Sequence, residues 1–133
     1  MRVFVDSSAF YAILDANDEN HIRAKELWTD LVAGKASLFT SSYVLVETMA
    51  LVQHRLGIAA VRTLQEDILP VVQVQWIGEG FHQAGSIAAL AAGRQQLSLV
   101  DCVSFEVMRA LGIRAAFAFD RHFDEQGVSR IPR

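Results

Sequence analysis

The feature that most constrains the fold of this 133-residue chain is the alternation of short apolar runs with helical patterns. Strand patterns rich in apolar residues occur at Arg2–Val5, Leu38–Thr40, Val72–Ile77, Arg114–Phe119 and Val128–Ile131. Helical patterns lie between them, at Ser8–Asp15, Asn20–Ala33, Ser42–Leu56, Ile58–Leu69, Gly80–Gln95 and Ser98–Leu111. Strands that alternate with helices pair in parallel and are covered on both faces. We therefore expect an α/β fold with a parallel sheet between two helical layers.

The length corresponds to a single domain, residues 1–133, with one sizeable core. Charges or amides interrupt every apolar run well before the roughly 18 residues that a membrane span needs. Asp6 follows only five residues, which does not fit a signal peptide, and the lone Cys102 has no disulfide partner within the chain. These features predict a cytoplasmic protein that does not cross a membrane.

The composition predicts an apolar surface that a partner covers. Apolar residues make up 52% of the chain and charged residues only 20%, against a typical charged fraction of about 25%. We expect exposed apolar side chains on the Asn20–Ala33 helix, at Leu27, Trp28 and Leu31, and on the Ser42–Leu56 helix. A partner protein or a second copy of the chain would cover them.

Asp6 and Asp120 each directly follow an apolar strand pattern. The carboxyl ends of parallel strands form the ligand crevice of an open sheet. If the two strands are neighbours, about 4.8 Å apart, the two carboxylates meet there. The alternative is that each aspartate only caps the turn or helix that follows it.

Glu47 is the only charge within the helical segment Tyr43–Val52. A carboxylate among apolar side chains costs free energy unless a cation or hydrogen-bond donors satisfy it. This environment favours a functional role over the alternative, an exposed glutamate on a polar stripe with Gln53 or His54.

Asp101 lies three residues after Ser98, in the spacing of a helix capping box. A cap is a sufficient structural reason for this aspartate. A functional role is compatible with it, because a first-turn carboxylate is held rigidly at the helix N-terminus.

Carboxylates that share one cleft repel one another, and without a cation some of them take up protons. A set of oxygen ligands without cysteine selects a hard divalent cation, Mg²⁺ or Mn²⁺, and such ions serve phosphoryl transfer in nucleases. The net charge of −3 does not exclude an RNA substrate. Setting these four acids aside leaves 11 of the 15 acids against 12 bases, so the remaining surface is not acidic.

Four segments of the chain resemble the PIN domain, and most of all the toxin nucleases of VapBC type. These segments are DSSAFYAILD from Asp6, TSSYVLVETMALV from Thr40, LSLVDCVSFEVMRALG from Leu97 and AFAFDRHFDEQG from Ala116. The resemblance extends from Asp6 to Gly127. It implies a three-layer α/β/α fold and a Mg²⁺- or Mn²⁺-dependent endoribonuclease that is a homodimer and is neutralised by a small antitoxin.

The resemblance assigns the catalytic and metal-binding acids to Asp6, Glu47, Asp101 and Asp120, in chain order. Ser7 matches the hydroxyl residue that often follows the first aspartate of the family. Many members also carry threonine or serine two residues before the fourth acid, where this chain has Ala118. The missing hydroxyl predicts weaker support for Asp120.

Five further residues have a functional and a structural interpretation. Arg94 and Arg121 could bind substrate phosphates or be solvated surface residues, and Asp124 could be an outer acid of the site or an exposed helix residue. His122 could assist a phosphate, although a partly exposed helix histidine is the simpler interpretation. Cys102 follows Asp101 without a paired base, so we expect it to pack in the core.

The function implied by the resemblance is water-mediated hydrolysis of RNA by a toxin, with an antitoxin arginine pairing with the acids. Two alternatives stay open: a PIN nuclease of RNA maturation without an antitoxin, and a PIN-like module that only binds. A phosphatase with an aspartate nucleophile fits less well, because its second aspartate would fall at Ser8.

Overall fold

The computed structural model describes all 133 residues and contains one five-stranded parallel sheet in the order β3-β2-β1-β4-β5. The strands are β1 (Arg2–Val5), β2 (Ser37–Ser41), β3 (Val72–Gln75), β4 (Ala115–Phe117) and β5 (Ser129–Ile131). β1 lies at the centre, so that its end is flanked by the ends of β2 and β4. This confirms the expected α/β fold with a parallel sheet.

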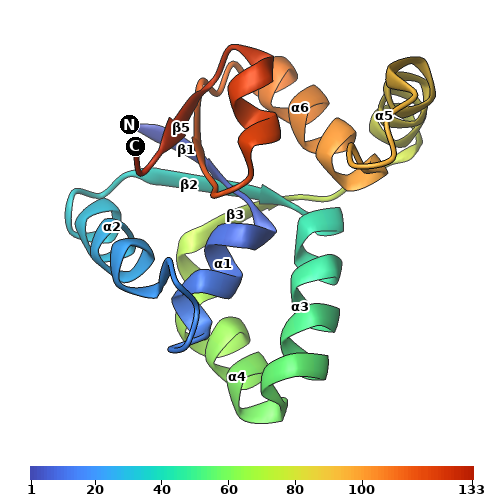
Figure 1. Ribbon diagram of the computed structural model, residues 1–133. Helices are drawn as coiled ribbons and strands as arrows, with labels where there is room; N and C mark the ends of the chain where they lie inside the picture. Colours follow the sequence, from blue (N-terminus) through green and yellow to red (C-terminus); the bar gives the residue numbers. More distant parts are fainter.

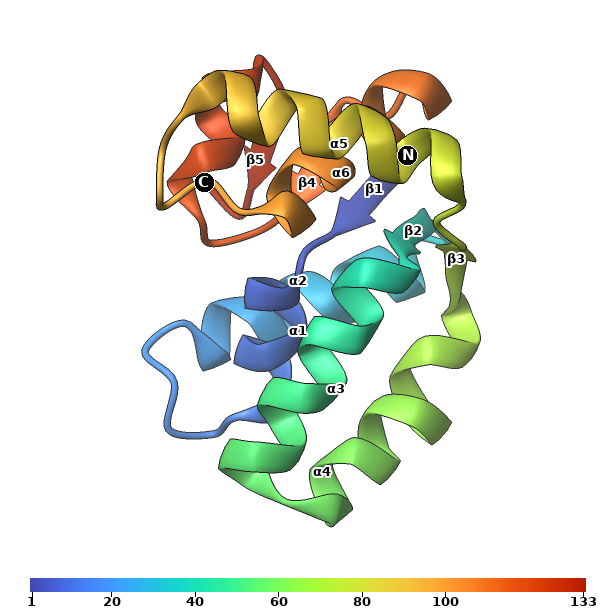
Figure 2. The ribbon, with the colours of Figure 1, turned by 90° about the vertical axis from the view of Figure 1, so that its right-hand side faces the viewer.

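Helices cover both faces of the sheet, which gives the three-layer α/β/α arrangement (Figure 1). One layer holds α1 (Ser7–Leu14), α2 (His21–Ala33), α3 (Ser42–Leu56) and α4 (Ile58–Thr63). The other holds α5 (Glu79–Ala92), α6 (Leu99–Leu111) and the 3₁₀ segment η3 (Arg121–Gln126). Figure 2 shows the sheet between these two layers, with α5 packed on α6. No helix is both long enough and apolar enough to cross a membrane.

The core forms where the central strands meet both helical layers. Val3, Phe4 and Val5 of β1 are fully buried, because helices cover both faces of the sheet at this strand. Phe117 of β4 and Phe123 of η3 are fully buried as well, and they belong to the same continuous core. This packing holds the carboxyl ends of β1 and β4 in fixed positions.

Serine hydroxyls set the start of α3, at the expected Ser42, and the end of β4, which is shorter than expected. The N-cap of α3 is Ser41, whose Oγ accepts a hydrogen bond from the Val44 amide, whereas Ser42 Oγ accepts one from the Ile77 amide. β4 ends at Phe117 and not at Phe119, because the Phe119 amide bonds to a side chain and leaves the sheet ladder. In both places a serine hydroxyl accepts the hydrogen bond of a backbone amide, since such side chains compete with the backbone for hydrogen bonds.

The expected helix over Ile58–Leu69 is divided into three segments. After α4 the chain widens into the π-helical η1 (Leu64–Ile68) and then tightens into the 3₁₀ segment η2 (Leu69–Val71). Pro70 lies in η2 and lacks the amide that a continuing helix would use.

The expectation of an exposed apolar face on α2 is wrong. Leu31 is buried, and Leu27 and Trp28 are half-buried against the core, because this face of α2 packs into its layer beside α1. Exposed apolar side chains occur on α3, at Val46, and directly after β3, at Trp76, which are 65% and 69% exposed. They line an apolar groove of about 530 Å³.

The contact between α5 and α6 requires a glycine at position 85. A Cβ on Gly85 would lie 2.4 Å from Val103 Cγ2 and 3.1 Å from the Val103 amide nitrogen. Val103 is fully buried and Gly85 is buried, so neither helix has free space at this point.

We predict that Gly85→Ala lowers the free energy of unfolding by about 1–3 kcal/mol, the usual cost of overpacking a core. Gly80→Ala on the same helix is the control, since a Cβ there meets no atom within 4 Å; its effect should be neutral or slightly stabilising. Urea unfolding of both variants measures the difference. Equal stabilities of the two variants would contradict the tight packing of α5 on α6.

Candidate active site at the carboxyl edge of the sheet

A polar cleft of about 420 Å³ opens at the carboxyl edge of the sheet. All four acids singled out in the sequence line it: Asp6 after β1, Glu47 on α3, Asp101 on α6 and Asp120 at the start of η3. They come from four separate elements, which the order β2-β1-β4 brings to one edge. The site therefore depends on the complete fold and not on any local motif.

Asp6 forms the floor of the cleft and is only 3% exposed. It is the N-cap of α1, and its Oδ2 accepts hydrogen bonds from the Ser8 amide, at 3.2 Å, and from Ser8 Oγ, at 2.6 Å. Its own amide donates to the Phe117 carbonyl of β4 at 3.0 Å. The capping role and the place in the site therefore belong to the same carboxylate.

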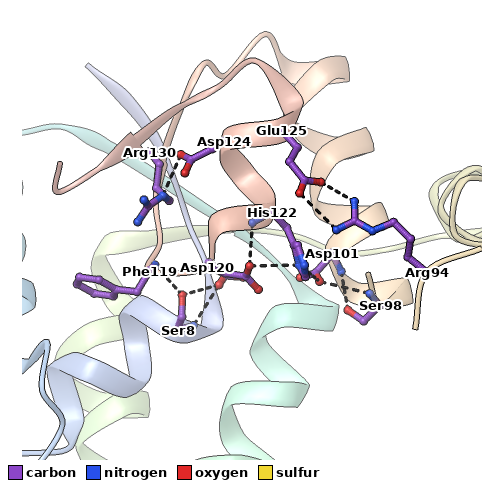
Figure 3. Close-up of polar contacts among 11 residues, drawn as sticks. Ser8, Arg94, Ser98, Asp101, Phe119, Asp120, His122, Asp124, Glu125 and Arg130 are labelled. Carbon is purple, nitrogen blue, oxygen red and sulfur yellow. Dashed lines mark hydrogen bonds and ion pairs between the residues drawn. The ribbon is translucent and has the colours of Figure 1, made fainter. Parts of the chain in front are cut away.

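Ser8 also supports the corner at Asp120, which the sequence had suggested to be weak. Ser8 Oγ accepts a hydrogen bond from the Phe119 amide at 3.0 Å, directly before Asp120 (Figure 3). Ala118 itself is fully buried. A hydroxyl from α1 therefore supports this segment, which residue 118 cannot do. Ser8 was not predicted as a site residue, although its position two residues after an N-cap aspartate is a signal for this role.

Glu47 is exposed on α3, and Ser7 Oγ donates a 2.6 Å hydrogen bond to its Oε1. The apolar neighbours of Glu47 on α3 do not bury its carboxylate. Its hydrogen-bond donor, Ser7, belongs to α1. Leu51 and Arg55 follow at intervals of one helical turn on the same face of α3, and both also line the cleft. Arg55 is the one basic residue among the lining residues.

Asp101 serves as a cap and as a member of the site at the same time. The Asp101 amide donates to Ser98 Oγ at 3.1 Å, and the Ser98 amide donates to Asp101 Oδ2 at 3.3 Å, which completes the capping box of α6. The side chain of Asp101 is 13% exposed. The capping box fixes the rotamer of this carboxylate at the cleft.

Asp101 and Asp120, which line the cleft, form a tight group with His122, which lies outside the lining (Figure 3). One possible ligand atom from each residue lies within 4.8 Å of the others. His122 Nδ1 is 3.2 Å from Asp120 Oδ1 and 3.6 Å from Asp101 Oδ2. Asp120 Oδ1 also accepts a 2.9 Å hydrogen bond from the His122 amide and so caps η3. Asp6 and Glu47 line the same cleft outside this group.

The acids of the site outnumber the nearby bases, since Arg55 is the one basic residue of the lining. Burial raises the pKa of Asp6 to about 6, against the opposing hydrogen bonds from Ser8, and the charge of Asp101 adds to the rise. Burial also raises the pKa of Asp101, and the nearby charge of Asp120 contributes in the same direction. A cleft that disfavours the charge of its own carboxylates is suited to a cation.

The other sequence candidates lie outside the lining of this cleft. Arg94 forms a bidentate ion pair with Glu125, at 2.6 and 3.3 Å, and Asp124 accepts a 2.9 Å hydrogen bond from Arg130. Arg121 is exposed. Cys102 is buried in the core behind Asp101, as expected from the sequence.

We predict that Asp6→Asn stabilises the protein in the presence of a chelator at pH 7.5. The pKa of Asp6 is higher in the folded state than in the unfolded state, so its ionisation costs stability, and this cost is complete above pH 6. Asparagine retains the N-cap acceptor without the charge, so we expect a gain of about 1–3 kcal/mol. Thermal unfolding from pH 4 to 7.5 measures it.

The gain should shrink as the pH falls from 6 toward 4, because the wild-type carboxyl then becomes protonated in the folded state. Asp67→Asn is the matched control, since Asp67 is exposed and lies outside the cleft. A pH-independent effect, or equal effects of the two substitutions, would contradict the assigned cause.

Comparison with known protein families gives a match to the PIN domain over residues 3–128, nearly the whole chain. The chain is also 34% identical over 130 residues to the 23S rRNA-specific endonuclease VapC20 of Mycobacterium tuberculosis, and the match covers 97% of each protein. The crystal structure of that VapC20, described as a sarcin-ricin loop cleaving toxin, superposes with a TM-score of 0.84 over 95% of each chain.

Two further solved structures share the fold at low sequence identity. VapBC2 from Rickettsia felis, bound to a DNA fragment from the promoter, gives a TM-score of 0.72 at 10% identity over 98% of this chain and 97% of the other. FitAcB from Neisseria gonorrhoeae gives 0.68 at 14% identity over 96% and 95%. From the domain match and the similarity to VapC20, the chain belongs to the PIN domain family, in its VapC-type branch.

Proposed function

We propose that this protein is a divalent-cation-dependent endoribonuclease toxin that cleaves large-subunit ribosomal RNA. The observation that carries this proposal is the convergence of Asp101, Asp120 and His122 within 4.8 Å, beside the cleft that Asp6, Glu47, Asp101 and Asp120 line. Dense carboxylates without paired cations are suited to hold a divalent ion beside a phosphodiester.

Two features of the group Asp101, Asp120 and His122 are suited to binding a divalent cation. The donor set consists of carboxylate oxygens with one imidazole, and His122 Nδ1 is buried with no hydrogen-bond partner. Asp101, Asp120 and His122 would hold the ion, and Asp6 and Glu47 would orient groups around it. A bound divalent cation supplies charge stabilisation at the phosphate and promotes ionisation of the attacking water.

Serine hydroxyls and backbone amides give the acids fixed positions before substrate binds. Asp6, Glu47 and Asp101 each accept a hydrogen bond from a neighbouring serine: from Ser8, Ser7 and the Ser98 amide respectively. Such preorganisation reduces the entropic cost of aligning the reacting groups.

The substrate proposal combines the comparison with the features of the cleft. VapC20 is described as a 23S rRNA-specific endonuclease and a sarcin-ricin loop cleaving toxin. In this chain, Arg55 provides a guanidinium at the cleft for a phosphate, and Asn20 and Gln96 provide amides for base edges or sugar hydroxyls. Arg94 and Arg121 remain proposed phosphate contacts at greater distance from the acids.

We predict that the purified protein with Mn²⁺ or Mg²⁺ cuts the large-subunit rRNA of isolated bacterial ribosomes at a single site. Asp101→Asn should reduce cleavage by at least about 100-fold, because it removes a charge from the acid cluster and retains the Ser98 cap. Mapping of the RNA ends by primer extension measures the site and the extent.

Glu106→Gln is the matched control, since Glu106 is on α6, pairs with Arg109 and lies outside the cleft. It should cleave like the wild type. Cuts in precursor RNA alone would favour the RNA-maturation alternative, and no cation-dependent cutting of any RNA would favour a PIN-like module that only binds.

We also propose that a small antitoxin neutralises the protein in the cytoplasm. Charge complementarity supports an arginine of that partner in the cleft, where a guanidinium can pair with two carboxylates and take the place of the cation. The exposed apolar groove beside Val46 and Trp76 provides apolar surface for protein contact. A homodimer remains a prediction.

We predict that the product of the adjoining small reading frame copurifies with this chain and abolishes cleavage at a one-to-one ratio. Addition of excess Mn²⁺ should partly restore activity if the partner's arginine competes with the cation. Titration of cleavage, with light scattering to count the copies in the complex, measures both. An active chain that the adjoining product neither binds nor inhibits would contradict the toxin assignment and leave the nuclease assignment intact.

A further inference from the structure

His122 carries the one buried side-chain nitrogen or oxygen of the protein that has no hydrogen-bond partner. Its Nδ1 is enclosed, and the imidazole is 18% exposed overall. A buried polar atom without a partner costs free energy of about 1–3 kcal/mol, so its presence in a folded protein requires an explanation. Its location between two carboxylates of the site suggests one.

The His122 imidazole is positioned by contacts of the backbone and of the next residue, and not by a hydrogen bond of its own Nδ1. The His122 amide donates to Asp120 Oδ1, and the next residue, Phe123, is fully buried in contact with Phe105. Nδ1 faces Asp101 Oδ2 and Asp120 Oδ1 at 3.6 and 3.2 Å, within ion-pair distance of both (Figure 3). It forms no hydrogen bond of adequate geometry with either oxygen. Nδ1 therefore has no partner of its own at the place where the two carboxylates converge.

We propose that His122 is a direct ligand of the divalent cation through Nδ1, so that the site prefers Mn²⁺ to Mg²⁺. This inference rests on the proposed cation-dependent function and specifies its metal site. Mg²⁺ is a hard ion that is bound through oxygen and retains its waters, whereas an imidazole nitrogen suits transition metals. One nitrogen added to two carboxylates moves the preference of the site toward Mn²⁺.

The arrangement also has a simpler interpretation, a protonated imidazole that forms ion pairs with Asp101 and Asp120. That interpretation predicts that His122 and a cation exclude each other, because the imidazolium has no free lone pair and would repel the ion. The two interpretations therefore differ in a spectroscopic property of the loaded protein that does not depend on RNA cleavage.

The test is pulsed electron paramagnetic resonance of Mn²⁺ bound to the full-length protein. A directly coordinated imidazole transfers spin density to its nitrogen, so we expect a nitrogen hyperfine coupling in the wild type. His122→Asn should abolish this coupling and retain an oxygen donor of similar reach. Histidine-specific isotopic labelling assigns the coupled nitrogen to a histidine.

Cation affinity gives the second readout, measured by the thermal shift in Mn²⁺ and in Mg²⁺. His122→Asn should weaken Mn²⁺ binding at least about tenfold, the lower range for loss of a residue that only orients a metal ligand. Its affinity for Mg²⁺ should change much less, so that the preference for Mn²⁺ falls. A purely structural role of His122 would lower both affinities together. His54→Asn, at an exposed position of α3, is the control and should change neither.

Bound Mn²⁺ without nitrogen coupling, or a variant that weakens both ions equally, would overturn the ligand assignment. Cleavage of RNA in the same samples would show that the proposed function stands in that case. If neither ion binds the wild type, the cation-dependent function fails together with the ligand assignment.

Discussion

The parallel pairing of β1 with β4 is the constraint on which the site depends. Val5 lies opposite Phe117, and the Asp6 amide continues the ladder to the Phe117 carbonyl. Because both strands end at this edge, the chain can place Asp6 under the loop that leads to Asp120. α6 leads directly into β4, and its N-terminus lies at the same edge, where the capping box presents Asp101. The position of the acids is therefore a consequence of strand order.

A fold that gathers acids must also hold them against their mutual repulsion, and here capping interactions do so. Three of the four acids are N-caps or capping-box residues: Asp6 of α1, Asp101 of α6 and Asp120 of η3. Backbone amides at helix N-termini stabilise carboxylates through hydrogen bonds and the helix dipole. The structural and functional interpretations of these residues are thus complementary. A residue that caps a helix at the edge of a sheet is already positioned to act on a ligand there.

The sequence was sufficient to predict the sheet and the helices, and also the aspartates Asp6 and Asp120 near the ends of β1 and β4. Hydrophobic periodicity and capping, on which these predictions rest, are local signals. Local patterns alone could not show that the four acids share one cleft, which only the family resemblance implied, since the distances between four separate elements depend on tertiary packing. Ser8 and His122 were missed or undervalued for this reason. Each has an ordinary local explanation, and its contact with the site appears only when α1, α6 and η3 come together. The face of α2 was misjudged because the pattern does not say what packs against it.

The apolar composition has a related explanation. Both faces of the sheet are covered, so β4 is apolar throughout and β1 is apolar after Arg2, and both account for part of the excess without any partner. Val46 and Trp76 are left exposed at the groove between α3 and β3, and further exposed apolar side chains lie on α2, α4 and α5. α3 also carries Glu47 and Arg55 on the face toward the cleft. One helix thus borders both the acidic cleft, through Glu47 and Arg55, and the apolar groove, through Val46.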